Sequence, residues 1–264
     1  MAQVHSVLVR AGQEPCAVTG RLAAPRLRRH VTGYSAFRSG MGAEGRRVLP
    51  LSLVVVIVDL ADMTALVSGP RDAPVALEET GWRHGVAIGL TPDGVQAVLG
   101  LPMRDLAGTI VALPDLLGSR AEELVGRLDA ASGWASRFAL LDGLFTAWLR
   151  ERRPDTAAVL GWRRLQNAGG SIKIGELAAE LGIGRRRLET GFAREIGQSP
   201  KTVARIARFQ HALQVLATPS ADFGAAAACG FSDQPHFNRE VRAMAGITPT
   251  ELRALVQYTE RLPG

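Results

Sequence analysis

The feature that most constrains this chain is a pattern that occurs twice near its C-terminus: a short amphipathic helix, a glycine, and a second amphipathic helix. In the first copy, Leu177, Ala178 and Leu181 recur at three- and four-residue spacing, which predicts a short helix with one apolar face. Gly182 follows, and glycine readily adopts the left-handed conformation that a tight turn needs. A second helix is predicted to begin near Arg185, because apolar residues then recur every four positions.

The second copy lies between Asp222 and Pro249. Gly230 marks its turn, Ser232 is the predicted N-cap, and Pro235 lies in the first turn of the next helix, where a missing N–H costs little. That helix is predicted to cover Asp233–Ala245. Two such copies in one chain predict a pair of helix-turn-helix motifs, each with a recognition helix suited to the major groove of DNA.

Each recognition helix divides into an apolar and a polar side. The apolar side is predicted to face inward at Leu188, Phe192, Ile196, Phe237, Val241 and Met244. The polar side supplies residue types that suit base edges and phosphates. The candidate DNA-binding residues are Arg185, Arg186, Arg187, Glu189, Thr190, Gln234, His236, Asn238, Arg239 and Arg242.

These residues resemble the AraC/XylS transcription regulators, whose C-terminal domain holds two such units joined by a long helix. The resemblance rests on L-A-x-x-L-G in the first unit, Ser199–Pro200, a long helix containing Arg205 and Arg208, and then C-G-F-S-D-Q-x-H-F and G-I-T-P. It covers roughly the last third of the chain and implies activation through contact with RNA polymerase. The base-facing positions that the resemblance implies are Arg186, Glu189, Thr190, Gln234, His236 and Arg239.

The chain departs from the family pattern in both units. Thr190 stands where the family commonly places an arginine, and the Arg185–Arg187 run could shift the contacts toward the start of that helix. Gly191 in mid-helix should cost roughly 1 kcal/mol relative to alanine. In the second unit, Asp222 and Ala225 occupy positions where the family prefers larger aliphatic residues, so Phe223 or a change of register must fill the space.

Charge agrees with a nucleic-acid partner. The net charge is +6 and the pI about 10.3. Residues 161–264 hold 14 Lys or Arg against 9 Asp or Glu, whereas residues 1–160 hold 17 against 16. Localised positive charge is expected where phosphate neutralisation contributes to affinity, although a high arginine background would also explain the pI. Glu189 has two readings: it accepts from cytosine N4, or it pairs with a neighbouring arginine along the helix.

Residues 1 to about 113 are expected to be β-rich, because short apolar runs alternate with turn residues. The runs are Gly33–Phe37, Val48–Leu60, Ala65–Ser68, Gly85–Leu90 and Gly94–Leu99. The strongest of them, from Leu51 to Leu60, reads as a buried strand. Helical periodicity follows at Leu116–Leu128 and Trp134–Leu149. Short strands divided by turns predict a small β-barrel or sandwich, and the family resemblance implies a cupin-like barrel. The predicted fold class is α+β: a β-rich, cupin-like barrel with helices, then an all-α domain whose two helix-turn-helix units are joined by the Pro200–Leu216 helix.

Two domains are expected at this length, residues 1–152 and 155–258. The charged, proline-containing stretch Glu151–Asp155 is the predicted linker, and a helix near Thr156–Gln166 opens the second domain. No signal peptide or membrane-spanning segment is recognisable. Because Cys16 and Cys229 are far apart and in different domains, a disulfide framework is not expected, and a cytoplasmic location fits.

No catalytic chemistry is expected. The first three histidines, His5, His30 and His84, are scattered instead of spaced as metal ligands on one strand, so neither a metal nor another cofactor is predicted. In many family members the N-terminal domain binds a small effector, forms a homodimer, or does both, and the resemblance implies the same here; the effector-binding residues are unknown. Trp82 either lines such a pocket or belongs to the core. The Arg21–Arg29 segment is either solvated or a second phosphate-binding patch.

Two other functions stay open from the sequence. The chain could be an architectural protein that binds DNA without sequence preference, or a cupin-type enzyme with a DNA-binding appendage.

Overall fold

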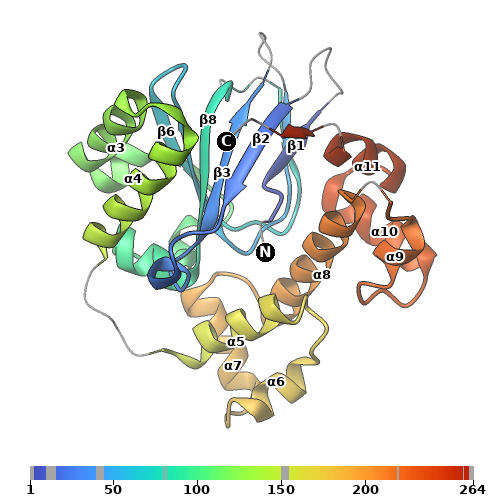
Figure 1. Ribbon diagram of the computed structural model, residues 1–264. Helices are drawn as coiled ribbons and strands as arrows, with labels where there is room; N and C mark the ends of the chain where they lie inside the picture. Colours follow the sequence, from blue (N-terminus) through green and yellow to red (C-terminus); the bar gives the residue numbers. More distant parts are fainter. Residues whose placement is uncertain are drawn as a thin grey trace.

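A computed structural model describes residues 3–9, 16–39, 45–78, 80, 82–149, 155–218, 220–257 and 259–261. The N-terminal part is β-rich with a few helices, and an all-helical part follows it (Figure 1). The predicted α+β class is therefore confirmed. The predicted linker at Glu151–Asp155 lies outside the described residues, apart from Asp155.

The larger of two sheets has, among the described residues, seven strands in the order β10-β2-β3-β8-β5-β6-β9. Neighbouring strands run antiparallel, except for β10 and β2, which run parallel. Every residue of β5 is buried, as predicted for the apolar run that begins at Leu51. The strands are Cys16–Arg21 (β2), Val31–Arg38 (β3), Val54–Asp59 (β5), Thr64–Ser68 (β6), His84–Leu90 (β8), Ile110–Ala112 (β9) and Thr259–Arg261 (β10).

The smaller sheet is antiparallel, in the order β1-β4-β7. Its strands are Ser6–Leu8 (β1), Arg46–Val48 (β4) and Val75–Leu77 (β7). Leu8 and Val48 from this sheet share an apolar cluster with Phe37, Val55 and Ile57 of the larger sheet. The two sheets therefore face each other across a common interior.

The larger sheet is buried on both faces, which follows from the two-residue periodicity of a strand. In β5, Val55 and Ile57 point toward the smaller sheet, whereas Val54, Val56 and Val58 belong to the main core. Helices α3 (Ser119–Ala130) and α4 (Gly133–Trp148) contribute to that main core through Leu124 and Phe145, among others, and cover this second face (Figure 1). A continuous apolar run, instead of an alternating one, is the expected signature of such a strand.

The N-terminal helices agree with prediction except at one place. They are Leu113–Leu117 (α2), Ser119–Ala130 (α3) and Gly133–Trp148 (α4), close to the two predicted periodic segments. The Gly94–Leu99 run, expected as a strand, is instead helical: Pro92–Gly94 (α1) leads into a π-helical turn at Val95–Leu99 (η2). The cause is local, because Thr91 caps this helix by accepting from the Gly94 N–H at 3.0 Å and Pro92 fits its first turn. Two short 3₁₀ turns occupy Pro25–Leu27 (η1) and Met103–Leu106 (η3).

The C-terminal helices match the predicted pair of units. The helix expected near Thr156–Gln166 is α5, and the predicted Pro200–Leu216 helix is α8. The first unit is formed by α5, α6 and α7 and the second by α9, α10 and α11, with α8 between them (Figure 1). The bounds are Ala157–Asn167 (α5), Ile174–Glu180 (α6), Arg185–Glu195 (α7), Pro200–Leu216 (α8), Phe223–Ala227 (α9), Gln234–Ala245 (α10) and Pro249–Gln257 (α11).

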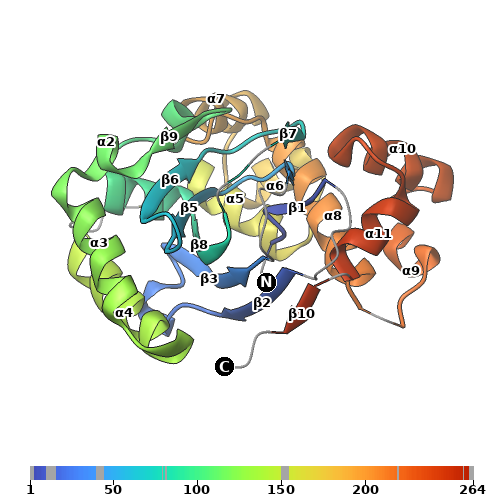
Figure 2. The same cartoon turned by 90° about the horizontal axis from the view of Figure 1, so that it is seen from above.

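The chain returns to the N-terminal part after its last helix. Strand β10 pairs with β2, placing Thr259 opposite Cys16 at the edge of the larger sheet (Figure 2). The helical part is therefore joined to the sheet through backbone hydrogen bonds as well as through side chains. None of the described helices combines the length and apolar character that crossing a membrane would require.

Candidate functional site

The first recognition helix, α7, is seated on α5 by its apolar side. Leu188, Phe192 and Ile196 are fully buried, as their four-residue spacing predicted. Gly191 faces α5 so closely that a Cβ placed there would lie 3.3 Å from the Cβ of Ala158. The mid-helix glycine thus has a packing role, since the close approach of α7 to α5 leaves little room for a side chain.

Both turns are made by glycines in the left-handed conformation, with φ of +64° at Gly182 and +98° at Gly230. Both turn predictions are confirmed. The prediction that Ser232 is the N-cap of the second recognition helix, α10, is wrong. Asp233 is the N-cap, because its carboxylate accepts from the His236 N–H at 2.6 Å. The N–H of Ser232 instead donates to the His236 ring at Nδ1 (3.3 Å). Ser232 and His236 are therefore hydrogen-bonded to each other at the start of α10.

In the second unit, Asp222 and Phe223 take roles that differ from the expected family pattern. Asp222 does not fill a core position; its carboxylate accepts from the Ala225 N–H at 2.7 Å and caps α9. Phe223 packs partly buried against the core of this unit, with the Arg253 guanidinium 5.5 Å from its ring centre. The inward side of α10 is buried, as predicted, at Phe237, Val241 and Met244.

The predicted DNA-binding side chains lie on the outer sides of α7 and α10. On α7 the exposed ones are Arg185, Arg186, Arg187, Glu189 and Thr190. On α10, Gln234, Arg239 and Arg242 are exposed, whereas His236 and Asn238 are half-buried. The fold therefore brings the predicted residues onto two helix surfaces, and their contacts with DNA stay a prediction.

Four of these arginines form no ion pair with any described residue: Arg186, Arg187, Arg239 and Arg242. Arg185 is different, because its Nε lies 2.9 Å from the Glu189 carboxylate one turn later. This contact favours the second reading of Glu189, as a helix-surface partner. The Thr190 hydroxyl donates to the Arg186 carbonyl at 2.9 Å, so it is also satisfied locally.

Two arginines of α8 hold the second unit in place, a role that sequence reasoning missed. Arg205 binds Glu240 of α10 through two contacts, Nε to Oε2 at 2.5 Å and Nη2 to Oε1 at 3.3 Å. Arg208 donates to the Gly230 carbonyl at 3.3 Å, at the turn. The acidic Glu240 between basic residues of a recognition helix was the available signal, since such a charge on a DNA-facing helix needs a local partner.

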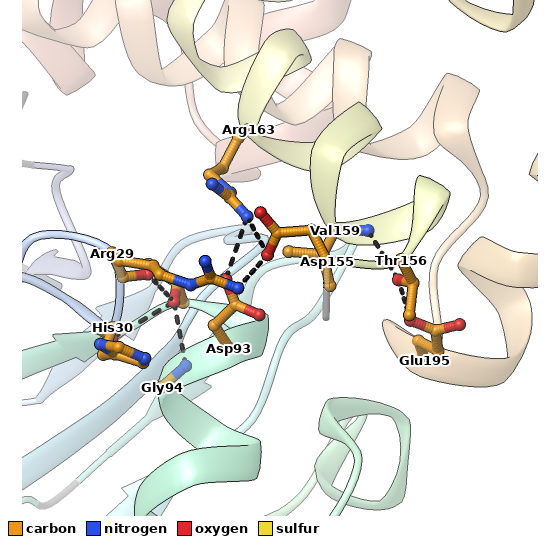
Figure 3. Close-up of polar contacts among 10 residues, drawn as sticks. Arg29, His30, Asp93, Gly94, Asp155, Thr156, Val159, Arg163 and Glu195 are labelled. Atoms are coloured by element: carbon orange, nitrogen blue, oxygen red, sulfur yellow. Dashed lines mark hydrogen bonds and ion pairs between the residues drawn. The ribbon is translucent and has the colours of Figure 1, made fainter. Parts of the chain in front are cut away.

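The first unit is fastened to the N-terminal part by four charged side chains (Figure 3). Arg163 of α5 lies 3.3 Å from Asp93 and 2.8 Å from Asp155, and Arg29 pairs with the same two carboxylates. Burial raises the pKa of the Asp93 carboxyl, although Arg29 and Arg163 act in the opposite direction. The Arg21–Arg29 segment was interpreted as either solvated or phosphate-binding. Neither interpretation fits Arg29, because its side chain is only 18% exposed and is ion-paired.

A cavity of about 450 Å³ lies between the two sheets. Its floor is the larger sheet, and five of the floor residues are small: Gly20, Gly33, Ser35, Ala87 and Gly89. Aliphatic and aromatic side chains such as Leu8, Phe37 and Ile57 form most of the remaining wall, and no acidic side chain among the described residues lines it. This size and lining suit a mainly apolar small molecule.

Arg46, His5 and Trp82 lie close together in the cavity wall. Arg46 is 6% exposed, with its guanidinium 5.6 Å from the ring centre of Phe37 and 6.0 Å from that of Trp82. The His5 ring lies 5.7 Å from Trp82. Burial lowers the pKa of His5 to about 3, and the charges of Arg71 and Arg46 add to the effect, so His5 is neutral at pH 7. Trp82 is 8% exposed, which confirms that it belongs to the core. It also lines the cavity, and its role in an effector pocket stays a prediction.

The helical part supplies a share of the cavity wall. Ala217, directly after α8, and Leu255 and Val256 of α11 line it together with strand residues. In the part of the chain that the structure describes, no group of three or more His, Cys, Asp or Glu side chains could hold a metal ion.

Comparisons with known proteins agree with the helical part. Residues 177–255 match a family model described as a helix-turn-helix domain. A probable bifunctional transcriptional activator/DNA repair enzyme AlkA of Mycobacterium tuberculosis is 40% identical over 82 residues, which are 31% of this chain and 16% of that protein. The chain thus spans about a sixth of the length of this relative.

Solved structures of low identity were also found. The C-terminal domain of AraT, a response regulator from Geobacillus stearothermophilus, is 17% identical with a TM-score of 0.36, over 39% of this chain and 88% of that one. ToxT from Vibrio cholerae is 10% identical with a TM-score of 0.49, over 91% of this chain and 97% of that one.

Proposed function

We propose that this chain, whose residues 177–255 form a helix-turn-helix domain of the AraC type, is a sequence-specific transcriptional regulator controlled by a small effector. The observation that carries the proposal is the pair of exposed recognition helices, α7 and α10, both packed on α8. Successive major-groove segments on one side of B-DNA lie about 34 Å apart. One chain would cover two such segments, bending the duplex if its helices are closer than that.

The four arginines that form no ion pair with any described residue are the first choice for DNA contacts. Arg186 and Arg239 take the base-facing roles, because a guanidinium can bind guanine O6 and N7 with two hydrogen bonds. Arg187 and Arg242 neutralise phosphates, which makes affinity depend on salt. The remaining candidates are assigned smaller parts, either base or backbone contacts. Four of them already have local partners, namely Arg185, Glu189, Thr190 and His236. The other two are Gln234 and Asn238.

The cavity between the sheets is the proposed effector site. Its wall favours a mainly apolar molecule, and His5, whose Nε2 is buried without a hydrogen-bond partner among the described residues, is the candidate for contact with a polar group. An effector changes DNA binding only if it binds the two conformations of the protein unequally. ToxT from Vibrio cholerae has been solved with an unsaturated fatty acid bound, which is the kind of occupant that such a cavity could take.

The finer assignments follow the AraC/XylS pattern. We assign residues 1–152 as the effector-binding and dimerisation domain and residues 155–258 as the DNA-binding domain. We also assign the protein a homodimeric state, a contact with RNA polymerase and a cytoplasmic location. No catalytic residue and no cofactor are assigned. A metal-dependent cupin enzyme would need a cluster of histidine and carboxylate ligands.

The test is a fluorescence-anisotropy titration of the full chain against the intergenic DNA upstream of its own gene, beside scrambled DNA of equal length, at two salt concentrations. A preference of about a thousandfold at physiological salt is expected for a specific regulator. Equal and steeply salt-dependent binding to both would instead support an architectural DNA-binding protein. The Arg186→Ala/Arg239→Ala variant should lose the preference, while an Arg164→Ala control, altered on the exposed side of α5, should keep it.

A further inference from the structure

The segment from Pro50 to Leu53, which leads into β5, joins the cavity to the helical part through three successive carbonyls. The Gln210 side chain donates to the Pro50 carbonyl at 3.0 Å, and the Gln198 side chain donates to the Leu51 carbonyl at 3.3 Å. The next carbonyl, that of Ser52, accepts from the Trp162 indole N–H at 2.9 Å. Three consecutive residues of the N-terminal part are therefore each bound by the helical part.

The three donors belong to three separate places in the helical part. Trp162 lies on α5 of the first unit, Gln198 lies in the turn between α7 and α8, and Gln210 lies on α8, which supports both units. All three are nearly inaccessible to solvent, with 3%, 8% and 1% exposed. A buried donor or acceptor is costly to leave without a partner. The segment thus cannot move away from the donors without moving the helices that hold them.

The same segment forms part of the cavity wall. Leu51 and Leu53 both line the cavity, and Leu51 belongs to the apolar cluster between the two sheets. Gln210 also binds both backbone groups of Val4, accepting from its N–H at 2.9 Å and donating to its carbonyl at 3.1 Å. Val4 is another residue of the cavity wall. The Pro50–Leu53 segment and Val4 therefore supply both side chains that an occupant would touch and carbonyls that bind the helical part.

We propose that the Pro50–Leu53 segment transmits occupancy of the cavity to both helix-turn-helix units. The proposal rests on the proposed function only for the identity of the cavity as the effector site. An apolar occupant displaces Leu51 and Leu53, and the attached carbonyls shift α5, the α7–α8 turn and α8 together. The ion pairs of Arg163 lie on another side of α5 and hold the first unit to a different region of the N-terminal part.

The experiment fills the cavity with a side chain, so that it needs neither an identified effector nor DNA. Ala87 lies on β8 between Ser35 and Ile57, and all three line the cavity. Ala87→Phe would add a ring there. Hydrogen–deuterium exchange of the full chain should then change by at least about threefold in residues 157–167 and 198–216, because local opening of these helices depends on their contacts.

The uncoupled background is Trp162→Phe, Gln198→Met and Gln210→Met, which removes the three donors while keeping side chains of similar size. In this background Ala87→Phe should change exchange only in the N-terminal part. A matched control, Arg164→Gln with Lys201→Gln, alters exposed positions of the same two helices and should leave the effect of Ala87→Phe intact.

The proposal would be overturned if Ala87→Phe changed the hydrogen–deuterium exchange of the helices equally in the two backgrounds. It would also be overturned if a folded Ala87→Phe variant left the exchange of these helices unchanged. If Ala87→Phe does not fold, Ala87→Ile takes its place, and the neutral dye N-phenyl-1-naphthylamine serves as an added occupant in both backgrounds. Dye that binds but leaves the exchange of α5 and α8 unchanged also overturns the proposal. Failure of DNA binding would affect the proposed function alone, because no arm of this experiment contains DNA.

Discussion

Breaking the contact between Arg205 and Glu240 should loosen the second recognition helix from α8. The two side chains make two close contacts, at 2.5 and 3.3 Å, and are only 36% and 21% exposed. Exposed ion pairs contribute up to about 1 kcal/mol, whereas breaking a fully buried pair costs about 3–5 kcal/mol. For this half-buried pair we expect a coupling of about 1–2 kcal/mol after allowing for solvent screening.

The assay is a double-mutant cycle measured by urea unfolding of the full chain. Arg205→Met keeps most of the arginine stem, and Glu240→Gln keeps the shape of the carboxylate. The matched control is the pair Arg164–Glu180, which has a similar 3.0 Å contact but is about half exposed on both sides. Its coupling should stay below about 0.5 kcal/mol.

Binding to specific DNA provides a second readout. Arg205→Met and Glu240→Gln should each weaken it about tenfold, which corresponds to about 1.4 kcal/mol, because both leave α10 less firmly oriented. Arg164→Met should not. A coupling no larger than that of the control pair would refute the argument that burial makes this contact important.

Four further outcomes are expected. Phe192→Ala should lower the free energy of unfolding by about 3–5 kcal/mol, since the ring is fully buried, and an unchanged melting curve would contradict this. Gly182→Ala should cost roughly 1–2 kcal/mol in the same measurement, because alanine is strained at φ +64°; a gain in stability would exclude strain. Arg239→Ala should cost about 1–3 kcal/mol on specific DNA and relax preference at one base pair, and an equal loss on scrambled DNA would rule out base readout by Arg239. The pKa of His5 is lowered to about 3 in the folded chain, so below about pH 6.5 the unfolded chain binds a proton at His5 that the folded chain does not bind. The melting temperature should therefore fall as the pH drops toward 5, and it should fall less in the His5→Gln variant. Equal dependence of the melting temperature on pH in the two proteins would show that His5 is not the group responsible.

The helical part was largely predictable because its signals are local. The spacing of Leu188, Phe192 and Ile196 predicted a buried face, and the glycines at positions 182 and 230 predicted both turns. These features depend on residues within a few positions of each other along one helix. The errors were local too: Asp233 and not Ser232 caps α10, since two neighbouring residues could both serve and only the backbone geometry selects one.

The N-terminal part was predictable in class but not in pairing. Apolar runs indicated strands, and β5 is as buried as expected. The 94–99 run became helical because Thr91 and Pro92 start a helix just before it. No pattern within a run states which strand lies beside it, so the two sheets and the cavity between them could not be derived.

The sequence by itself determined the two helix-turn-helix units, their buried faces and the set of polar residues that they present, because helix periodicity and turn glycines are written in short stretches of chain. Only the tertiary structure decided how these units are held: Arg205 on Glu240, Arg163 on Asp93, and three buried donors on the carbonyls of residues 50–52. Each of these contacts joins residues far apart in the sequence. Their partners are fixed by how sheets and helices pack, which local spacing does not encode.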